Sequence, residues 1–472
     1  MKEKNLVGVK GAIRAAEGIV EVFLLTVSYY LAWRHGYDEG IFPTYYGYGK
    51  YVLMGIYSVL LIVLVYNYDG FKFGYLKLFD VAVSQWIAVF IANFITYFHL
   101  CLIANKMISP MPMLLLTVFN AIICFVCVFV YTAIYHRIYT PKNMVMVFGN
   151  RDAVSLKFKM ETRADKYAVN KLLPIELGFE KICTEIVKYD AVVLSDVPSQ
   201  IRNDILKFCY ERRMRTYVAP KLSDIIVRGA QNISLFDTPL LLVRSRGLTV
   251  TQRVIKRAFD ILLCSIALIP AAPFMLLVAL AIRIEDGGPV FYKQRRATIG
   301  GEVFEILKFR SMIVDAEKDG KSIPATDHDP RITKVGRFIR ATRLDELPQL
   351  LNILKGDMSI VGPRPERIEH IEQYGRDIPE FGFRLKVKGG LTGYAQIYGK
   401  YNTSAYDKLR LDLMYIENYS LLLDVKLILM TIRIMLSKES TEGFDKAEKL
   451  ARLVQESLDE ENAQREEQIP AR

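Results

Sequence analysis

The chain has 472 residues, which leaves room for about three domains. Half of the residues (51%) are apolar, which is high for a soluble protein and indicates membrane segments. The net charge of +11 predicts anionic partners. Because no nucleic-acid-binding motif is present, lipid and phosphate are favoured and nucleic acid is not expected. The six cysteines predict no disulfide framework.

Four apolar runs fill the first segment, 1–140, and each is about long enough as a helix to cross ~30 Å of hydrocarbon. The runs are 12–33, 51–66, 79–104 and 113–135. They predict a bundle of four transmembrane helices. Glu17 and Glu21 lie in the first run, where we expect acids that face the bundle or lie at the membrane interface, with an ion pathway as the alternative.

The basic residues around these runs predict the orientation of the bundle. Lys and Arg are more frequent before the first run, between the second and third, and after the fourth than in the other two loops. Both ends of the bundle are therefore expected on the cytoplasmic side. This predicts a multi-pass protein of the bacterial inner membrane, with its remaining domains on the cytoplasmic face.

Segment 141–248 alternates apolar strands with helices, which predicts a Rossmann-like α/β cytoplasmic domain. The first strand ends in G-N-R-D (149–152) and not in G-x-G-x-x-G. Without those glycines a pyrophosphate cannot approach the backbone closely. A regulatory or assembly domain is therefore favoured over a nucleotide site.

A fifth apolar run at 258–282 contains Pro270 and Pro273 near its middle. Each proline removes a backbone donor and clashes with the preceding turn. Each half of the run is about half a bilayer long as helix, and basic residues flank both ends. We expect a re-entrant helix-break-helix that dips into the membrane and returns. The alternative, a kinked spanning helix, would place the following residues outside the cell.

The segment 249–436, mainly helical by prediction, contains the acid pair Asp345 and Glu346. Pro348 is tolerated only in the first turn of a helix, so the helix is expected to begin at Asp345 or Glu346. Unpaired backbone N–H groups there favour a charged Asp345, as a nucleophile or a metal ligand requires. Paired acids also predict Mg²⁺, held by Asp345 and Glu346 together with substrate phosphates.

Six of the arginines in this segment are candidate phosphate ligands, because guanidinium groups match phosphate oxygens in a bidentate fashion. They are Arg310, Arg331, Arg337, Arg340, Arg343 and Arg364. Acids, arginines and a metal site predict phosphoryl chemistry, and the membrane dip predicts that one phosphate belongs to a lipid. The last segment, 437–472, is expected to be a charged helix and tail.

Three motifs in this segment resemble the catalytic module of the bacterial sugar transferases, the monotopic polyprenyl-phosphate phosphoglycosyl transferases. They are D-P-R-I-T (329–333), L-D-E-L-P-Q (344–349) and G-D-M-S-I-V-G-P-R-P-E (356–366). The N-terminal organisation resembles the long-form members that start exopolysaccharide or O-antigen synthesis. Two departures stand out. The re-entrant run breaks at I-P-A-A-P in place of Ser-Pro, and Gly389-Gly390 stands where Pro-Gly is usual.

The resemblance implies transfer of a sugar 1-phosphate from a UDP-sugar to undecaprenyl phosphate, giving a lipid diphosphate sugar and UMP. Asp345 would attack the β-phosphorus and form a phosphosugar-aspartate, and Glu346 would support it through Mg²⁺ or as an acid–base partner. Substrate-binding roles would fall to Arg364, Arg310, Arg331, Arg340 and Asp412. For Arg310 and Arg331, ordering of the fold is an equal alternative.

Two other hypotheses remain at this point. In one, the acids bind metal only and the lipid phosphate attacks the UDP-sugar directly. In the other, the chain is a membrane-anchored scaffold that senses a nucleotide. The sugar and the ligand of segment 141–248 stay open, as does the oligomeric state, for which a homodimer is one alternative.

Overall fold

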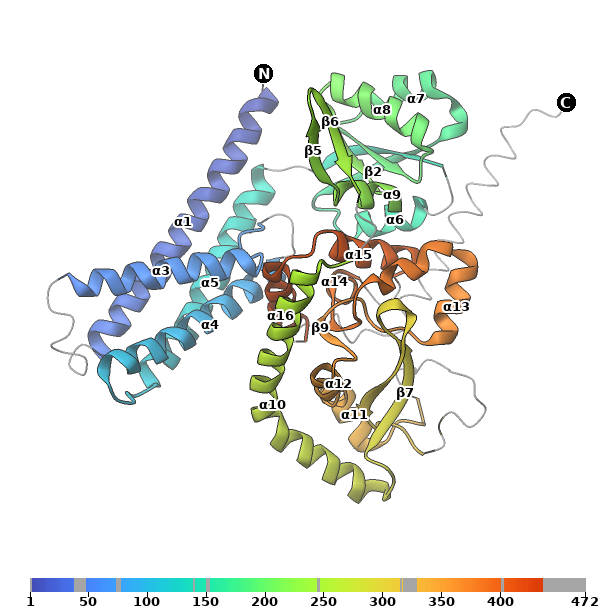
Figure 1. Ribbon diagram of the computed structural model, residues 1–472. Helices are drawn as coiled ribbons and strands as arrows, with labels where there is room; N and C mark the ends of the chain where they lie inside the picture. The colour runs from blue at the N-terminus through green and yellow to red at the C-terminus, as the bar shows by residue number, and fades with distance from the viewer. Residues whose placement is uncertain are drawn as a thin grey trace. The chain divides into compact units, whose positions relative to one another are not determined.

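The computed structural model describes residues 2–37, 48–73, 78–138, 141–149, 153–243, 247–314, 316, 329–399 and 403–435 (Figure 1). The chain forms two compact units. One comprises Met1–Val147, Leu156–Val193 and Asn203–Thr216, and the other comprises Phe148–Ser155, Leu194–Arg202 and Tyr217–Arg472. The predicted charged tail, 437–472, lies outside the described residues, and the predicted domain boundaries stay predictions.

The four predicted N-terminal helices are present and are long and apolar enough to cross a membrane. They are α1 (Lys2–Gly36), α3 (Gly49–Asn67), α4 (Leu78–Ala104) and α5 (Met111–Ile138). Within the described part of the chain, a fifth such helix is α10 (Val250–Asp286). The prediction of a membrane protein with four N-terminal helices is therefore confirmed at the level of length and composition.

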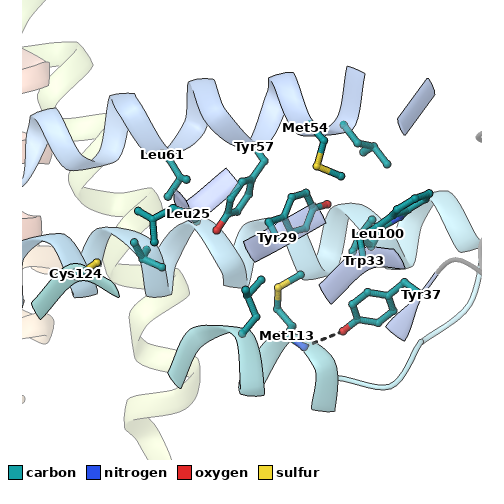
Figure 2. Close-up of a cluster of buried hydrophobic side chains, with 14 residues drawn as sticks. Leu25, Tyr29, Trp33, Tyr37, Met54, Tyr57, Leu61, Leu100, Met113 and Cys124 are labelled. Carbon is teal, nitrogen blue, oxygen red and sulfur yellow. Dashed lines mark hydrogen bonds between the residues drawn. The ribbon is translucent and has the colours of Figure 1, made fainter. Parts of the chain in front are cut away.

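Aromatic and aliphatic side chains together form a core in the N-terminal bundle (Figure 2). The rings of Tyr29 and Tyr57 stack with centroids 4.1 Å apart, and the backbone N–H of Met113 donates to the hydroxyl of Tyr37 over 3.2 Å. Glu21 is buried and accepts a 2.8 Å hydrogen bond from Gln85 on α4. Glu21 thus faces the bundle interior, as predicted.

The α/β segment forms a four-stranded sheet with strand order β2-β1-β3-β4. Its elements are β1 (Lys142–Phe148), α6 (Ala153–Glu161), β2 (Tyr167–Pro174), η1 (Ile175–Leu177), α7 (Phe179–Ile186), β3 (Ala191–Ser195), α8 (Ser199–Glu211), β4 (Arg215–Val218) and α9 (Leu222–Arg228). The central strands β1 and β3 are apolar and largely buried, as strands covered on both faces should be. The mixed α/β character is confirmed, and the Rossmann-like arrangement stays a prediction. An exposed antiparallel hairpin, β5 (Gln231–Leu235) and β6 (Thr238–Leu242), follows.

The segment that follows is mainly helical, as predicted, with four short strands among its described residues. After α10 come β7 (Phe291–Ala297), η2 (Ile299–Gly301), β8 (Val303–Phe309), α11 (Lys334–Ala341), η3 (Leu344–Glu346), α12 (Gln349–Lys355), β9 (Ser359–Val361), α13 (Ile368–Asp377), η4 (Pro379–Lys386), β10 (Gly390–Thr392), α14 (Tyr394–Tyr398), α15 (Ala405–Glu417) and α16 (Leu421–Met435). The strands β7 and β8 pair antiparallel, and β9 pairs with β10 in parallel.

Helix α10 begins at a capping box and continues through both prolines. The Thr249 hydroxyl accepts from the N–H of Gln252, whose side chain accepts in turn from the N–H of Thr249. Pro270 and Pro273 lie inside one helix, and Figure 1 shows its axis turning midway. The predicted break is therefore a bend within a continuous helix, as proline permits when neighbouring turns adjust.

Both ends of α10 are attached to the same compact unit. Near its start, Arg257 donates to the carbonyls of Ile353 and Leu354 at the end of α12, where a cation complements the helix dipole. At its other end, Glu285 accepts from the backbone N–H of Lys334 over 2.8 Å, and Asp286 pairs with Arg310. The two ends of α10 are thus bound by α11 and α12, through residues that lie about 20 positions apart in the sequence.

Glycines allow the backbones around β9 and β10 to approach closely. A side chain at Gly390 would lie 2.1 Å from the backbone N of Gly362, and one at Gly389 would lie 2.5 Å from Pro365 Cγ. The N–H of Gly390 also donates to the carbonyl of Pro363 over 2.9 Å. Gly389-Gly390, which stands where Pro-Gly is usual, therefore packs closely against the G-P-R-P segment.

Candidate active site

The acid pair lies in a short 3₁₀ turn, η3, that precedes α12. Arg343 enters this turn with a left-handed backbone (φ 59°), and α12 begins only at Gln349, after Pro348. The prediction that the helix begins at Asp345 or Glu346 was therefore wrong. The N–H of Glu346 is already donated to the carbonyl of Arg343 over 3.3 Å, so the helix N-terminus does not explain the charge of the pair.

Glu346 is held by two cations from different elements. Arg364 Nη2 donates to Glu346 Oε1 over 2.8 Å, and Lys308 Nζ of β8 lies 3.3 Å from the same oxygen. Burial alone would raise the pKa of Glu346, but the charges of Arg364 and Lys308 hold that pKa well below its usual range. Glu346 is thus a fixed anion, and it places two positive groups beside its neighbour Asp345.

Asp345 contrasts with Glu346 in both hydrogen bonding and charge. Its Oδ1 is buried and has no hydrogen-bond partner among the residues that the structure describes. Burial and the neighbouring charge of Glu346 raise the pKa of Asp345, while Lys308 and Arg343 oppose that rise. The expected lowering of this pKa by a helix N-terminus is therefore not found. Because Oδ1 makes no hydrogen bond to the described residues, it is free to contact a substrate atom or a metal ion.

The pair fits a magnesium ion through Asp345 more readily than through Glu346. Mg²⁺ binds proteins through one or two carboxylates plus substrate phosphates, and the unpartnered Oδ1 of Asp345 supplies one such ligand. The Oε1 of Glu346 is already engaged by Arg364 and Lys308. No cluster of three or more acidic, His or Cys ligands occurs in the described residues, so most ligands would come from substrate and water.

A second, buried ionic cluster supports the backbone of Arg364. Arg384 donates from Nη2 to the Arg364 carbonyl over 3.0 Å and lies 2.8 Å from Asp412 Oδ2 on α15. Its Nη1 lies 3.4 Å from Glu366, which also pairs with Lys408 at 3.2 Å. Arg384 and Asp412 are only 2% and 1% exposed, so this pair is closed to solvent, whereas Lys408 at the edge of the cluster is 32% exposed.

The pKa values of the two acids in this cluster, Asp412 and Glu366, are shifted in opposite directions. Burial raises the pKa of Asp412 to about 6, against the lowering effect of Arg384. Burial also acts on Glu366, but Arg384 and Lys408 lower its pKa to about 2. The guanidinium of Arg384 therefore pairs with both carboxylates, and Glu366 is the one that stays ionised.

Asp412 provides a prediction on the pH dependence of stability. Its folded pKa of about 6 lies above the usual 3.8, so the folded chain holds this proton more tightly than the unfolded chain. Its contribution to the free energy of unfolding therefore falls as pH rises from about 4 to 6, by on the order of 3 kcal/mol at most. We expect the thermal midpoint of the wild type, relative to that of Asp412→Asn, to decrease across this range. A constant difference between the two melting curves would contradict it.

The remaining predicted site residues lie away from direct contact with the acid pair. Arg310 is buried and pairs with Asp286 at the end of α10. Arg331 forms a bidentate pair with Asp329, with one contact of 2.6 Å, and lowers the pKa of Asp329 to about 2. Arg340 is half-buried on α11 and lowers the pKa of Asp345 by its charge. The substrate-binding assignments of these residues stay predictions.

Lys308, Arg384 and Glu366 were not singled out from the sequence. Glu366 is the last residue of the G-D-M-S-I-V-G-P-R-P-E motif, whereas Lys308 lies in L-K-F-R-S-M (307–312), outside the three motifs named above. Arg384 lies in no such motif, and only its packing identifies it. In the sequence, Lys308 stands near the end of a strand and close to other cations, and this position could have identified it.

Comparison with known proteins places these residues in one family region. A family described as "Bacterial sugar transferase" matches residues 251–438. The chain is 39% identical over 248 residues to the UDP-glucose:undecaprenyl-phosphate glucose-1-phosphate transferase of Klebsiella pneumoniae, covering 52% of this chain and 51% of that protein. It is 42% identical over 211 residues to the Escherichia coli protein of the same description, covering 44% of each chain.

A longer alignment reaches beyond the matched region. The UDP-N-acetylgalactosamine-undecaprenyl-phosphate N-acetylgalactosaminephosphotransferase of Aeromonas hydrophila is 35% identical over 327 residues, which cover 67% of this chain and 72% of that protein. The alignments with the Klebsiella and Escherichia proteins span about half the length of those relatives. The relatives are described with different sugars, so similarity alone does not name the sugar for this chain.

Proposed function

Because the chain belongs to the bacterial sugar transferase family, we propose that it transfers a sugar 1-phosphate from a UDP-sugar to undecaprenyl phosphate, releasing UMP. The product would start the assembly of an exopolysaccharide, capsule or O-antigen. The observation that carries the proposal is the acid turn in the matched region. There, the unpartnered oxygen of Asp345 lies beside Glu346, which is fixed by Arg364 and Lys308.

In the proposed mechanism Asp345 is the nucleophile. Its carboxylate oxygen forms a bond to the β-phosphorus of the UDP-sugar while the bond from that phosphorus to the bridging oxygen breaks, and UMP leaves with the electron pair. A phosphate oxygen of the lipid then attacks the same phosphorus and releases Asp345. Arg364 and Lys308 neutralise charge on the phosphoryl oxygens, and Glu346 keeps both cations in place.

Bound Mg²⁺ would supply a Lewis acid that draws charge from the diphosphate. Asp345 is the residue of this chain best placed to hold it, with Glu346 as the second carboxylate. We expect removal of divalent ions with EDTA to abolish UMP release, and Mg²⁺ to restore it, because few protein ligands are present to retain the ion. Full UMP release in excess EDTA would contradict this expectation, which a colorimetric assay of UMP can test.

We also propose that α10 dips into the membrane from the cytoplasmic face and returns to it. The attachment of both ends of α10 to one compact unit supports this geometry, because Arg257 and Glu285 bind residues of neighbouring helices. The bend at Pro270 and Pro273 supports it as well. In the same picture, the α/β segment is a Rossmann-like cytoplasmic domain, and a homodimer is compatible with the family.

A screen for UMP release tests the proposed function directly. Purified full-length protein in nanodiscs would be incubated with undecaprenyl phosphate, Mg²⁺ and each of several UDP-sugars. We expect one sugar, or a small set, to release UMP over many turnovers only when the lipid phosphate is present, and no more than about one UMP per chain without it. The scaffold hypothesis would gain if no UDP-sugar released UMP under these conditions. Lack of a phosphosugar adduct despite turnover would favour direct attack by the lipid phosphate.

A further inference from the structure

The four carbonyl groups of segment 363–366 all accept hydrogen bonds from other elements of the fold. Pro363 and Pro365 have no N–H group, so at these two residues the carbonyl is the only backbone group that can anchor the chain. The donors are, in the order of the carbonyls that they bind, the N–H of Gly390 (2.9 Å), Nη2 of Arg384 (3.0 Å), Nη1 of Arg296 (3.1 Å) and the N–H of Ala297 (3.2 Å). The backbone that carries Arg364 is therefore held at four successive positions.

The side chain of Arg364 depends on this backbone for its place in the site. It is 42% exposed, and its Nη2 contacts Glu346 over 2.8 Å. A partly exposed arginine has several rotamers open to it, so the reach of its guanidinium depends on where the backbone puts its Cα. The carbonyls that Gly390, Arg384 and Arg296 bind all lie within one residue of that Cα.

Arg296 stands at the end of a hydrogen-bonded row on one face of β7. Tyr292, Gln294 and Arg296 alternate along the strand and therefore point to the same face. Gln294 Nε2 donates to the Tyr292 hydroxyl over 3.2 Å, and Gln294 Oε1 accepts from Arg296 Nη2 over 2.5 Å. Because Arg296 Nη1 donates to the carbonyl of Pro365, both terminal nitrogens of this guanidinium are bound by the protein.

The same face of the β7–β8 hairpin also contacts the acid turn. Tyr292 pairs with Lys308 across the two strands, and residues opposite one another in a sheet share a face. Lys308 contacts Glu346, the acid that the side chain of Arg364 binds. The hairpin thus contacts Arg364 in two ways, through Glu346 at its side chain and through Arg296 at its backbone.

We propose that Arg296 is a positioning residue, which binds the Pro365 carbonyl and thereby sets the distance between the guanidinium of Arg364 and the phosphorus that Asp345 attacks. The inference rests on the proposed function, because Arg296 acts on the reacting phosphate only through Arg364. Direct contact with a substrate phosphate is the other role that an arginine could have here. It would require Arg296 to give up one of its two bonds to the protein.

Three variants of the full-length protein in nanodiscs test this role. Arg296→Met removes both donors at a similar side-chain length, and Arg296→Lys keeps the charge without the planar fork. The matched control is Arg295→Met, which changes the neighbouring arginine on the opposite, exposed face of β7. Two readouts are compared with the wild type. They are the hydrogen exchange of backbone amides in segment 359–367, followed by mass spectrometry, and the kcat and KM of UMP release.

In Arg296→Met we expect exchange in segment 359–367 to become at least about fivefold faster, because the segment opens more readily. We expect kcat to fall about 10- to 100-fold and KM for the UDP-sugar to change less than threefold, since a misplaced Arg364 is missed mainly in the transition state. Arg296→Lys should recover part of both losses, and Arg295→Met should show neither.

Three results would overturn the inference. Unchanged exchange in Arg296→Met would mean that Arg296 does not hold the segment. Faster exchange with normal kcat would leave Arg296 with a structural role alone. A raised KM with normal kcat would mean that Arg296 binds the substrate directly.

Gln294→Leu keeps the question decidable if melting curves show that Arg296→Met does not fold. This variant removes the acceptor that orients Arg296, so we expect faster exchange in segment 359–367 and a kcat about 3- to 10-fold lower. Wild-type behaviour of Gln294→Leu in both readouts would then reject the inference.

The proposed function and this inference fail separately. If the wild type released no UMP from any UDP-sugar, the proposed function would fail. The exchange measurement needs no turnover, so it would still show whether Arg296 holds the backbone of Arg364 in place.

Discussion

Asp345→Asn should lose at least about 10³-fold in the rate of UMP release, because the amide cannot attack phosphorus and the residual rate comes from binding and charge neutralisation alone. Incubation of the wild type with UDP-sugar labelled in the sugar, without lipid phosphate, should leave one labelled phosphosugar per chain, seen by intact-protein mass spectrometry. The variant should leave none. Because Oδ1 of Asp345 has no hydrogen-bond partner among the described residues, the substitution breaks no hydrogen bond at that oxygen.

Asp377→Asn is the matched control, since Asp377 is exposed at the end of α13 and has no place in the acid turn. It should retain both turnover and the labelled adduct. Normal turnover of Asp345→Asn would refute the covalent mechanism. An inactive variant together with a wild type that forms no adduct would support the other mechanism. In that mechanism Asp345 and Glu346 only bind the metal, and the lipid phosphate attacks the UDP-sugar directly.

Arg384→Gln should lower the free energy of unfolding by about 3–5 kcal/mol, because it leaves Asp412 and Glu366 buried without their shared cation. Turnover should fall as well, since Arg384 also holds the carbonyl of Arg364. The midpoint of thermal unfolding in nanodiscs measures the first effect. Arg384→Lys, which keeps the charge but not the fork, should recover part of the stability and less of the turnover.

The matched control is Arg376→Gln, which removes an exposed arginine from α13. We expect a change within about 0.5 kcal/mol, as for most surface substitutions. An unchanged midpoint for Arg384→Gln would mean that the buried cluster does not stabilise the fold. A destabilised variant with normal turnover at low temperature would mean that Arg384 acts on the fold alone.

Features of the site that depend on nearby residues were predictable. Asp345 and Glu346 are adjacent in sequence, and Arg364 lies between two prolines. In the structure Arg364 contacts Glu346, so these residues meet at the acid turn. The prediction for the start of α12 was wrong because Pro348 is tolerated just before a helix as well as in its first turn. A preceding 3₁₀ turn leaves the same sequence signature.

Contacts between distant segments were not predictable. Lys308 reaches Glu346 from a strand 38 residues away, and Arg384 reaches Asp412 from another element. No periodicity relates such residues, and an isolated buried arginine resembles an exposed one in sequence. Arg310 was noticed in the sequence, but its role could not be predicted. The sequence does not show whether this arginine binds a phosphate or, as in the structure, pairs with Asp286.

The attachment of α10 to α12 has a consequence for how the chain is made. Arg257 precedes its partner Ile353 by 96 residues, so α10 leaves the ribosome well before the residues that hold it exist. During that interval only lipid can shield its apolar side chains from water. We therefore expect a membrane to accept this helix before the residues of α12 are made, so that the contact between Arg257 and Ile353 closes late in folding.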